Sequence, residues 1–260
     1  MAETAYEKDS TYKAFSFSVI VSQLFGFLCV ILTGIWMGHY HTGFHWGSAD
    51  IDDATQRQAE EAKIRLYHPL FMVLGFVFLQ GEALIVFRLY RHEKKLFAKL
   101  LHGIVHSAAI CLVVSGLVAI FYLKRHVANI KSMTTPHSWL GIALVIVYMM
   151  QYVCGFCTFL FPRLKGELRK WYLPIHTFAG CTIFVLSTVQ CVAGISNWLM
   201  AFGDPNCLLG NAELKLDSWF CSEGLVVIFL QFCLVFFALS VVYIVVMPQY
   251  RRLRTPDELH

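Results

Sequence analysis

Six long apolar runs constrain this chain more than any other feature of its sequence. Each holds roughly 20 residues or more, enough for an α-helix to cross a hydrocarbon core of about 30 Å. Backbone polar groups must be satisfied within the protein inside a bilayer, so such runs fold as helices. The 260 residues are 57% hydrophobic and 15% charged, whereas a soluble domain carries about 25% charged residues. We therefore expect a single all-α, integral membrane six-helix domain over 1–260, with spans at about 16–38, 68–88, 102–123, 139–161, 177–199 and 222–246.

The connections between these runs carry an unequal share of the positive charge. Fourteen Lys and Arg residues fall on the side that holds both termini, and seven fall on the other side. Cytoplasmic loops are enriched in Lys and Arg, so both termini are expected in the cytoplasm. Residues 1–15 are polar and no small-residue cleavage site follows the first run, which favours a retained helix over a signal peptide. No basic stripe with interleaved aromatic residues suggests a nucleic-acid partner.

Four histidines lie near the starts of four consecutive apolar runs: His68, His102, His137 and His176. Consecutive spans run in opposite directions, so His68 and His137 are predicted near the non-cytoplasmic face, and His102 and His176 near the cytoplasmic face. Histidine inside a bilayer is rare and usually functional, and neutral imidazole binds metals well. A zinc site needs three or four ligands at one level, whereas each level here supplies two. Two opposed imidazoles suit a six-coordinate haem iron, which favours electron transfer. Spans two to five are therefore predicted to form a core holding two haems.

The residues alone leave other interpretations open. His106 follows His102 by four residues and lies on the same helix face, so it competes for the same ligand position. The histidines could instead carry protons or divalent metal in a haem-free transporter. They could also hold haem in a relay subunit without its own substrate site. Prolines next to three of these histidines predict helix starts near 68, 136 and 174, because proline is tolerated in a first turn.

Other polar and small residues carry weaker expectations. Glu82 lies within the second span and either relays a proton or pairs with a basic residue or water near the cytoplasmic interface. Residues 39–67 are expected to form a solvated acidic loop. Most glycines within the spans are expected to serve helix packing, and two or three to face a haem. Cys207 and Cys221 fall in the last non-cytoplasmic loop, where an oxidising compartment would allow a disulfide. The other seven cysteines are expected to act as small hydrophobes.

Several short motifs occur in a fixed order along the chain. They are Tyr67-His-Pro-Leu-Phe-Met72, Phe78-Leu-Gln-Gly81, Ala83-Leu-Ile-Val-Phe-Arg-Leu-Tyr-Arg91, Lys99-Leu-Leu-His-Gly-Ile-Val-His106, His137-Ser-Trp139 and Leu173-Pro-Ile-His176. With them the chain resembles the cytochrome b561 family of transmembrane two-haem, ascorbate-dependent reductases over roughly residues 16–255. The family uses the first histidine of its Lys-x-x-His-Gly-x-x-His pattern as a ligand, which favours His102 over His106.

The resemblance implies a function and a set of partners. It implies two haem b groups, ascorbate as the cytoplasmic electron donor, and monodehydroascorbate radical or a ferric chelate as the acceptor on the other side. It also implies a homodimer in the plasma membrane or in an endosomal, lysosomal or secretory-vesicle membrane. The stretch Ala83–Arg91 is similar to the family's cytoplasmic ascorbate motif. Contacts to ascorbate are expected from Arg88, Lys95, Lys99 and Arg169, although each is also an ordinary positive-inside residue.

The chain departs from the family on the non-cytoplasmic side. Thr134-Thr-Pro136 replaces the family's Tyr-Ser-Leu before the His-Ser-Trp motif. The family's outer-loop histidine is replaced or shifted, which leaves Lys124 and His126 as candidates for the acceptor site. A basic rim here suits an anionic ferric chelate.

Overall fold

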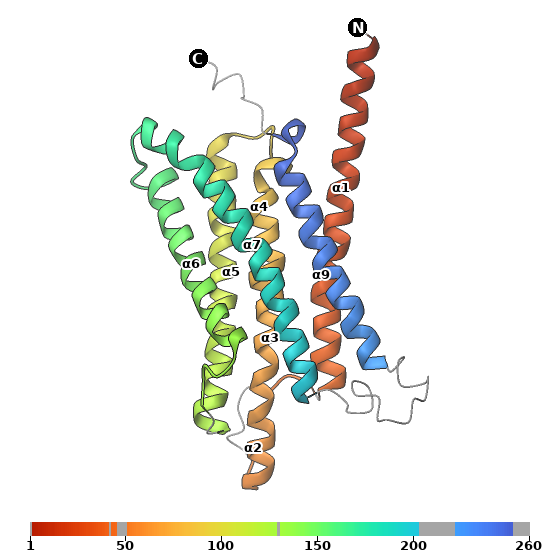
Figure 1. The fold of residues 1–260 in the computed structure, drawn as a ribbon, viewed down its shortest axis with the longest axis vertical. Coiled ribbons are helices and arrows are strands. Elements are labelled where there is room, and N and C mark those ends of the chain that lie inside the picture. The colour runs from red at the N-terminus through yellow and green to blue at the C-terminus, as the bar shows by residue number, and fades with distance from the viewer. Residues whose placement is uncertain (1, 42, 46–50, 129–130, 203–221, 252–260) are drawn as a thin grey trace.

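The computed structural model describes residues 2–41, 43–45, 51–128, 131–202 and 222–251. Within these ranges the chain is helical and contains no strand (Figure 1). Six helical stretches are long and apolar enough to cross a membrane: Ser10–Tyr40, Ala54–Leu89, Lys95–Val127, Pro136–Phe159, Gly166–Ala201 and Ser222–Val246. The predicted all-α six-helix fold is therefore confirmed. The candidate disulfide partners Cys207 and Cys221 lie outside the described residues.

Several spans combine more than one type of helix. The first is α1 (Ala2–Ile35) followed by the π-helix η1 (Trp36–Tyr40). The second consists of α2 (Ala54–Ala62), the 3₁₀ segment η2 (Lys63–Leu66), α3 (Tyr67–Phe71), the π-helix η3 (Met72–Leu79) and α4 (Gln80–Leu89). The others are α5 (Lys95–Tyr122) with η4 (Leu123–Val127), α6 (Pro136–Phe159), α7 (Gly166–Phe202) and α9 (Ser222–Val246), which the short η6 (Pro248–Tyr250) follows.

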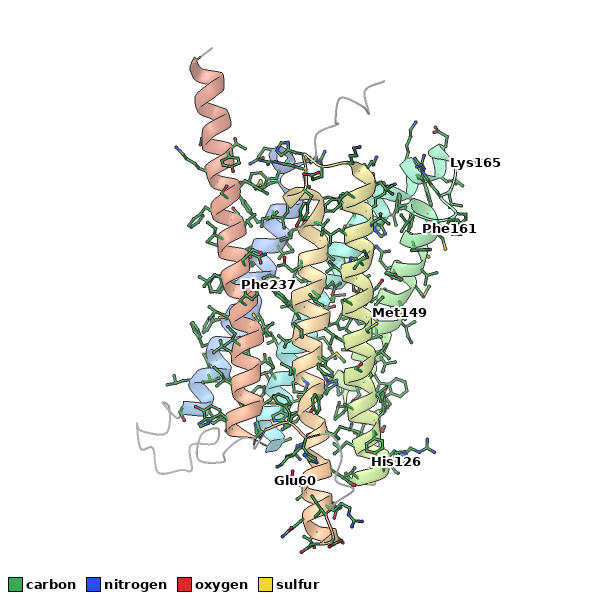
Figure 2. All side chains as sticks on the ribbon, turned by 180° about the vertical axis from the view of Figure 1, so that it is seen from behind. Glu60, His126, Met149, Phe161, Lys165 and Phe237 are labelled. Carbon is green, nitrogen blue, oxygen red and sulfur yellow. The ribbon has the colours of Figure 1, made fainter. Side chains whose placement is uncertain are left out.

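Consecutive spans are antiparallel, so the bundle has two ends (Figure 1). At the Lys99 end, α1, α5 and α7 begin, and α4, α6 and α9 finish. At the Lys124 end, α1, α5 and α7 finish, and α2, α6 and α9 begin. Figure 2 shows Phe161 and Lys165 at the Lys99 end, and Glu60 and His126 at the Lys124 end.

The packing divides the bundle into an outer pair of helices and a core of four spans. Helix α1 lies along α9, while the second span lies between α5, α7 and this outer pair. Within the core, Gly75 allows the second span to pack closely against α5. A Cβ on Gly75 would lie 2.9 Å from the carbonyl oxygen of Ala109, so a larger residue would force the two helices apart.

Two local expectations were wrong and one was right. A helix does start at Pro136, where the Thr135 side chain caps the Ser138 N–H. Pro69 and Pro174, by contrast, lie inside continuous helical stretches: α2 and η2 lead into α3 without a break, and α7 begins at Gly166. Helices in membranes tolerate proline because neighbouring helices and local 3₁₀ or π adjustments satisfy the freed backbone groups. Pro69 is flanked by such segments, η2 and η3.

The region 39–67 was expected to be a solvated acidic loop; none of residues 54–62 is buried, as expected, but they form a helix. This helix is α2, which extends the second span beyond the rest of the bundle (Figure 1). Asp53 caps this helix, because its carboxylate accepts hydrogen bonds from the N–H groups of Thr55 (2.7 Å) and Gln56 (3.2 Å).

Candidate functional site

The four histidines form two pairs at different levels of the bundle. The ring centres of His68 and His137 are 6.4 Å apart, with ring planes at 90°. Those of His102 and His176 are also 6.4 Å apart, with ring planes at 68°. The structure therefore brings together the partners that the antiparallel spans predicted.

The spacing within each pair fits a metal ion between the rings. A bond from imidazole to a first-row metal is about 2.0 Å long and the nitrogen lies about 1.1 Å from the ring centre, so two imidazoles on one ion have centres roughly 6.2 Å apart. Among the described residues, no group of three or more His, Cys, Asp or Glu side chains could hold a metal ion. The donor set therefore fits the two axial positions of a haem iron better than it fits a tetrahedral site.

One histidine of each pair is oriented by a backbone carbonyl on the neighbouring helix. His68 Nδ1 lies 3.1 Å from the carbonyl oxygen of Gly116, and His102 Nδ1 lies 2.8 Å from that of Ala83. A carbonyl oxygen can only accept a hydrogen bond, so Nδ1 carries the proton in both rings. This leaves the Nε2 lone pair of each ring available to a metal, as in most histidine-ligated sites.

The other histidine of each pair faces a glycine. A Cβ on Gly194 would lie 2.7 Å from His137 Cε1, and a Cβ on Gly155 would lie 2.6 Å from His176 Cε1. Any larger residue would therefore displace these rings. Gly155 and Gly194 belong to the set of glycines that sequence analysis divided between packing and haem-facing roles.

Two glutamines complete this arrangement and were not found from the sequence. Gln190 on α7 donates to the carbonyl oxygen of His137 on α6 (2.5 Å), and Gln151 on α6 donates to that of His176 on α7 (2.7 Å). Helices α6 and α7 thus each supply one histidine, one glycine and one glutamine. The second contact of each glutamine differs: Gln190 Nε2 also lies 3.0 Å from His137 Nδ1, whereas Gln151 Oε1 accepts a hydrogen bond from the Tyr172 hydroxyl (3.4 Å). His176 Nδ1 is buried and has no hydrogen-bond partner among the described residues.

His106 lies beside the second pair. Its ring centre is 4.5 Å from that of His102 and the two rings are nearly perpendicular (84°). His106 Nδ1 is engaged by the hydroxyl of Tyr148 at 2.8 Å. His106 therefore packs against the His102 ring. It is His102, and not His106, whose ring centre lies 6.4 Å from that of His176.

A cavity of about 360 Å³ surrounds the pair at the Lys124 end. Its wall includes both histidines, the apolar side chains of Met72 and Phe76, and the two glycines Gly141 and Gly194. It also includes the cations Arg65 and Lys124 and no Asp or Glu among the described residues. Arg65 was not predicted as a site residue, and only its position one turn before His68 could have suggested it.

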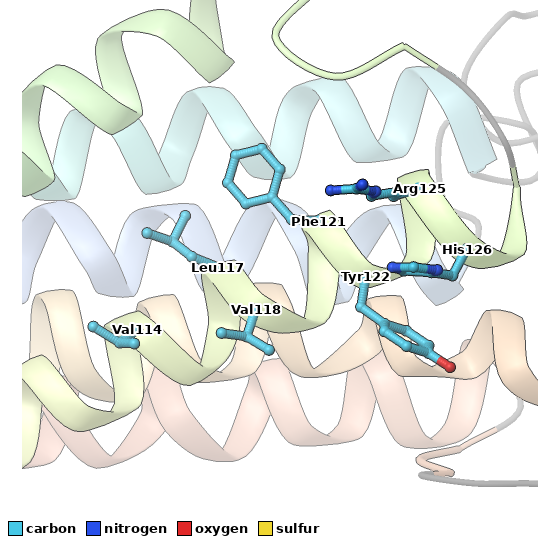
Figure 3. A pocket seen from close by; sticks show the side chains of 7 residues that line it. All are labelled: Val114, Leu117, Val118, Phe121, Tyr122, Arg125 and His126. Atoms are coloured by element: carbon cyan, nitrogen blue, oxygen red, sulfur yellow. The ribbon is translucent and has the colours of Figure 1, made fainter.

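The two candidates for the acceptor site do not lie together. Lys124 is partly buried and lines the histidine cavity, whereas His126 is exposed and stacks on Tyr122 with ring centres 5.1 Å apart. His126 and Arg125 belong to a shallow groove on α5 and η4 whose other lining residues are mostly apolar (Figure 3).

At the Lys99 end the predicted ascorbate contacts fall into two places. Lys99 donates to the carbonyl oxygen of Phe159 (2.9 Å), and Lys95 and Arg169 lie within electrostatic range of it. Arg163, which was not predicted, joins this group. Arg88 has different neighbours: it donates to the carbonyl oxygen of Val245, and the cation within electrostatic range of it is Arg251.

Glu82 does not pair with a basic residue among its described contacts. Its carboxylate accepts a hydrogen bond from Gln23 Nε2 (2.8 Å), which links α4 to α1. The Glu82 side chain thus faces α1, one of the outer pair of helices. Neither interpretation of Glu82 from the sequence anticipated this helix contact.

A buried polar cluster at the Lys124 end also went unnoticed in the sequence. Glu223 at the start of α9 accepts a hydrogen bond from Trp36 Nε1 (2.9 Å) and lies 3.1 Å from His41 Nε2. Trp198 Nε1 donates to the same His41 nitrogen (3.1 Å). Burial lowers the pKa of His41, and the carboxylate of Glu223 opposes this effect.

Comparison with known proteins agrees with this geometry. The eukaryotic cytochrome b561 family matches residues 67–201, which include all four paired histidines. Transmembrane ascorbate-dependent reductase CYB561 of Homo sapiens is 36% identical over 251 residues, covering 96% of this chain and 90% of the relative. The protein of the same name in Bos taurus is 35% identical over 241 residues (92% and 85%). Plasma membrane ascorbate-dependent reductase CYBRD1 of Xenopus laevis is 34% identical over 193 residues (73% and 63%). This chain belongs to the cytochrome b561 family.

Proposed function

We propose that this protein is an oxidoreductase that carries electrons across a membrane. Ascorbate on the cytoplasmic side is the donor, and monodehydroascorbate radical or a ferric chelate on the other side is the acceptor. The Lys99 end faces the cytoplasm in this proposal, in keeping with the excess of Lys and Arg on that side. The observation that carries the proposal is the presence of two imidazole pairs, each 6.4 Å apart, at opposite ends of one bundle.

The chain holds two haem b groups in this proposal, one for each histidine pair. Each haem, when bound, supplies an iron that takes up and releases one electron. His68 and His137 would hold the haem at the Lys124 end, and His102 and His176 would hold the haem at the Lys99 end. Carbonyl, glycine and glutamine contacts hold these rings in place, which limits reorganisation when the charge at a site changes.

The donor site is the cluster formed by Lys95, Lys99 and Arg169, with Arg163 beside it. Ascorbate is an organic anion, and a cluster of cations concentrates anions at a surface. The position of Lys99 one turn before His102 puts this charge next to the ligand pair on the same side. Arg88 donates a hydrogen bond to the Val245 carbonyl near the end of α9. It contributes positive charge to the ascorbate site without belonging to the cluster.

The finer features of the acceptor side are also proposals. Lys124 binds the acceptor from the cavity wall, and His126 acts from the neighbouring surface. A disulfide between Cys207 and Cys221 closes the last loop in the oxidising compartment. The active form is a homodimer, in the plasma membrane or in an endosomal, lysosomal or secretory-vesicle membrane.

Reduction across a sealed membrane tests the function. The purified protein should be red, with two haems per chain, and vesicles loaded with ascorbate should reduce an impermeant ferric chelate outside. A colourless protein from haem-replete cells would favour a transporter. A red protein that ascorbate alone cannot reduce would be a relay subunit. Ascorbate-loaded vesicles without the protein are the control for leakage.

A further inference from the structure

Two cations border the cavity at the Lys124 end. Arg65 and Lys124 line the same cavity as His68 and His137, in a wall that is otherwise mostly apolar. Both cations are partly buried, and Lys124 is within electrostatic range of both imidazoles. A charge beside an apolar cavity is stabilised when an anion enters it, since the two charges then compensate each other away from bulk water.

The Arg65 guanidinium rests on a preformed support. It lies 5.7 Å from the ring centre of Trp198, a distance at which a guanidinium is attracted to an indole face. Trp198 is buried and also lines the cavity, and its N–H is held by His41, which in turn contacts Glu223. The contacts of Trp198 with Trp36 and His41, and of His41 with Glu223 at the start of α9, therefore fix the ring on which Arg65 rests.

Neighbouring cations at this end differ in their surroundings. Arg125 follows Lys124 directly, yet its side chain is exposed and lines the outer groove rather than the histidine cavity (Figure 3). The helical twist therefore directs one member of this basic pair inward and the other outward. Arg65 is the second inward cation, and it comes from η2 on a different span.

We propose that Arg65 and Lys124 bind a carboxylate in the cavity that contains His68 and His137. An arginine fork matches a carboxylate with two parallel hydrogen bonds, and a lysine adds a flexible point charge. The carboxylate has two chemical sources: the side groups of a haem bound at this pair, or a carboxylate-bearing ferric chelate that accepts the electron. If the carboxylate belongs to the ferric chelate, the inference rests on the proposed function. It then adds Arg65 to the acceptor site that contains Lys124.

The test uses Arg65→Gln, Lys124→Gln and the conservative Arg65→Lys, with Arg125→Gln as a matched loss of charge. The first measurement is an optical redox titration of the full-length protein without acceptor. If the carboxylate belongs to a haem, Arg65→Gln lowers one of the two midpoints or removes that haem, because a cation disfavours the oxidised iron. Arg65→Lys restores part of the shift, and Arg125→Gln leaves both midpoints in place.

The second measurement compares ferric citrate with an uncharged ferric chelate. If the carboxylate belongs to the acceptor, Arg65→Gln and Lys124→Gln raise the KM for ferric citrate roughly tenfold, as expected for the loss of one charged hydrogen bond. The KM for the uncharged chelate and both midpoints then stay as in the wild type. Variants that match Arg125→Gln in both measurements overturn the proposal.

A third measurement separates this inference from the proposed function. Citrate binding to the purified protein, followed by calorimetry, needs neither ascorbate nor electron transfer. Binding that is lost in Arg65→Gln supports the carboxylate site even if ascorbate fails to reduce the protein. Normal reduction by ascorbate, with wild-type citrate binding and wild-type midpoints in Arg65→Gln, refutes the site and leaves the proposed function intact.

Discussion

The two histidine pairs share one plan but have different surroundings. In each pair, a backbone carbonyl holds one ring and the other ring faces a glycine. A glutamine donates a hydrogen bond to the backbone carbonyl of the histidine that faces the glycine. The pair at the Lys124 end lies in a cavity bordered by two inward cations. The pair at the Lys99 end lies among aromatic rings, with its cations on the helix ends nearby.

This comparison shows that the helix packing fixes the geometry of the histidine pairs, whereas the surroundings of each pair can vary. The spacing of the rings depends on helix packing, and the reciprocal contacts of α6 and α7 make it equal at both ends. The charge and shape around each pair depend on residues at the helix ends, which can change without altering that spacing. We therefore expect equal ligand geometry with different redox potentials and different small-molecule partners.

Removing one histidine from either pair is expected to have the largest effect, and it tests whether each pair binds its own haem. His137→Ala and His176→Ala should each reduce the haem content from two per chain to one, because a single imidazole leaves an iron position open. Haem content per chain and the number of midpoints in a redox titration are the measurements. His106→Ala should keep both haems, and loss of a haem in that variant would transfer the ligand role from His102.

Filling the two glycine positions should perturb one pair at a time. Gly194→Ala should disturb the His137 ring and Gly155→Ala the His176 ring, since the new Cβ would lie under 3 Å from each ring. Overpacking of this kind costs about 1–3 kcal/mol. Haem retention during thermal denaturation reports the effect. Gly34→Ala is the control, because nothing lies within 4 Å of its added Cβ. Equal behaviour of all three variants would contradict the interpretation that Gly194 and Gly155 make room for the histidine rings.

Removing one positive charge at each end of the bundle should show which end interacts with ascorbate. Lys99→Gln should slow reduction by ascorbate several-fold at low ionic strength, and added salt should diminish the difference because it screens the attraction. Lys124→Gln should leave this rate unchanged. Stopped-flow absorbance of the haem measures both. A rate that falls equally in the two variants would show that charge at the Lys99 end is not specific for the donor.

Replacing the glutamines by leucine should have the smallest effect, and it tests how the glutamine contacts differ between the two sites. Gln151→Leu and Gln190→Leu each remove a hydrogen bond to a histidine carbonyl, worth about 1 kcal/mol. Gln190→Leu should be the more destabilising of the two, because the second contact of Gln190, to His137 Nδ1, is shorter (3.0 Å) than that of Gln151 with the Tyr172 hydroxyl (3.4 Å). Midpoints of thermal haem loss give the comparison, and a larger effect of Gln151→Leu would refute it.

The sequence predicted the number of spans and the pairing of the histidines well. Both depend on patterns that repeat along the chain: apolar length, and one histidine per span in antiparallel order. It failed for Pro69 and Pro174, because local proline rules do not account for neighbouring helices that satisfy the backbone. Arg65, Gln151 and Gln190 act through contacts with other spans, 25 or more residues away for the glutamines, and nothing in their local sequence marks them.

The reciprocal contacts of α6 and α7 have a consequence for how the protein is made. At the Lys124 end both imidazoles are present once α6 has been synthesised, but Gly194 and Gln190 follow only with α7. At the Lys99 end one of the two imidazoles is itself on α7. Neither pocket is complete until the ribosome has passed Phe202, so cofactor loading is expected late in biogenesis, and nascent chains that stop earlier should leave the translocon without pigment.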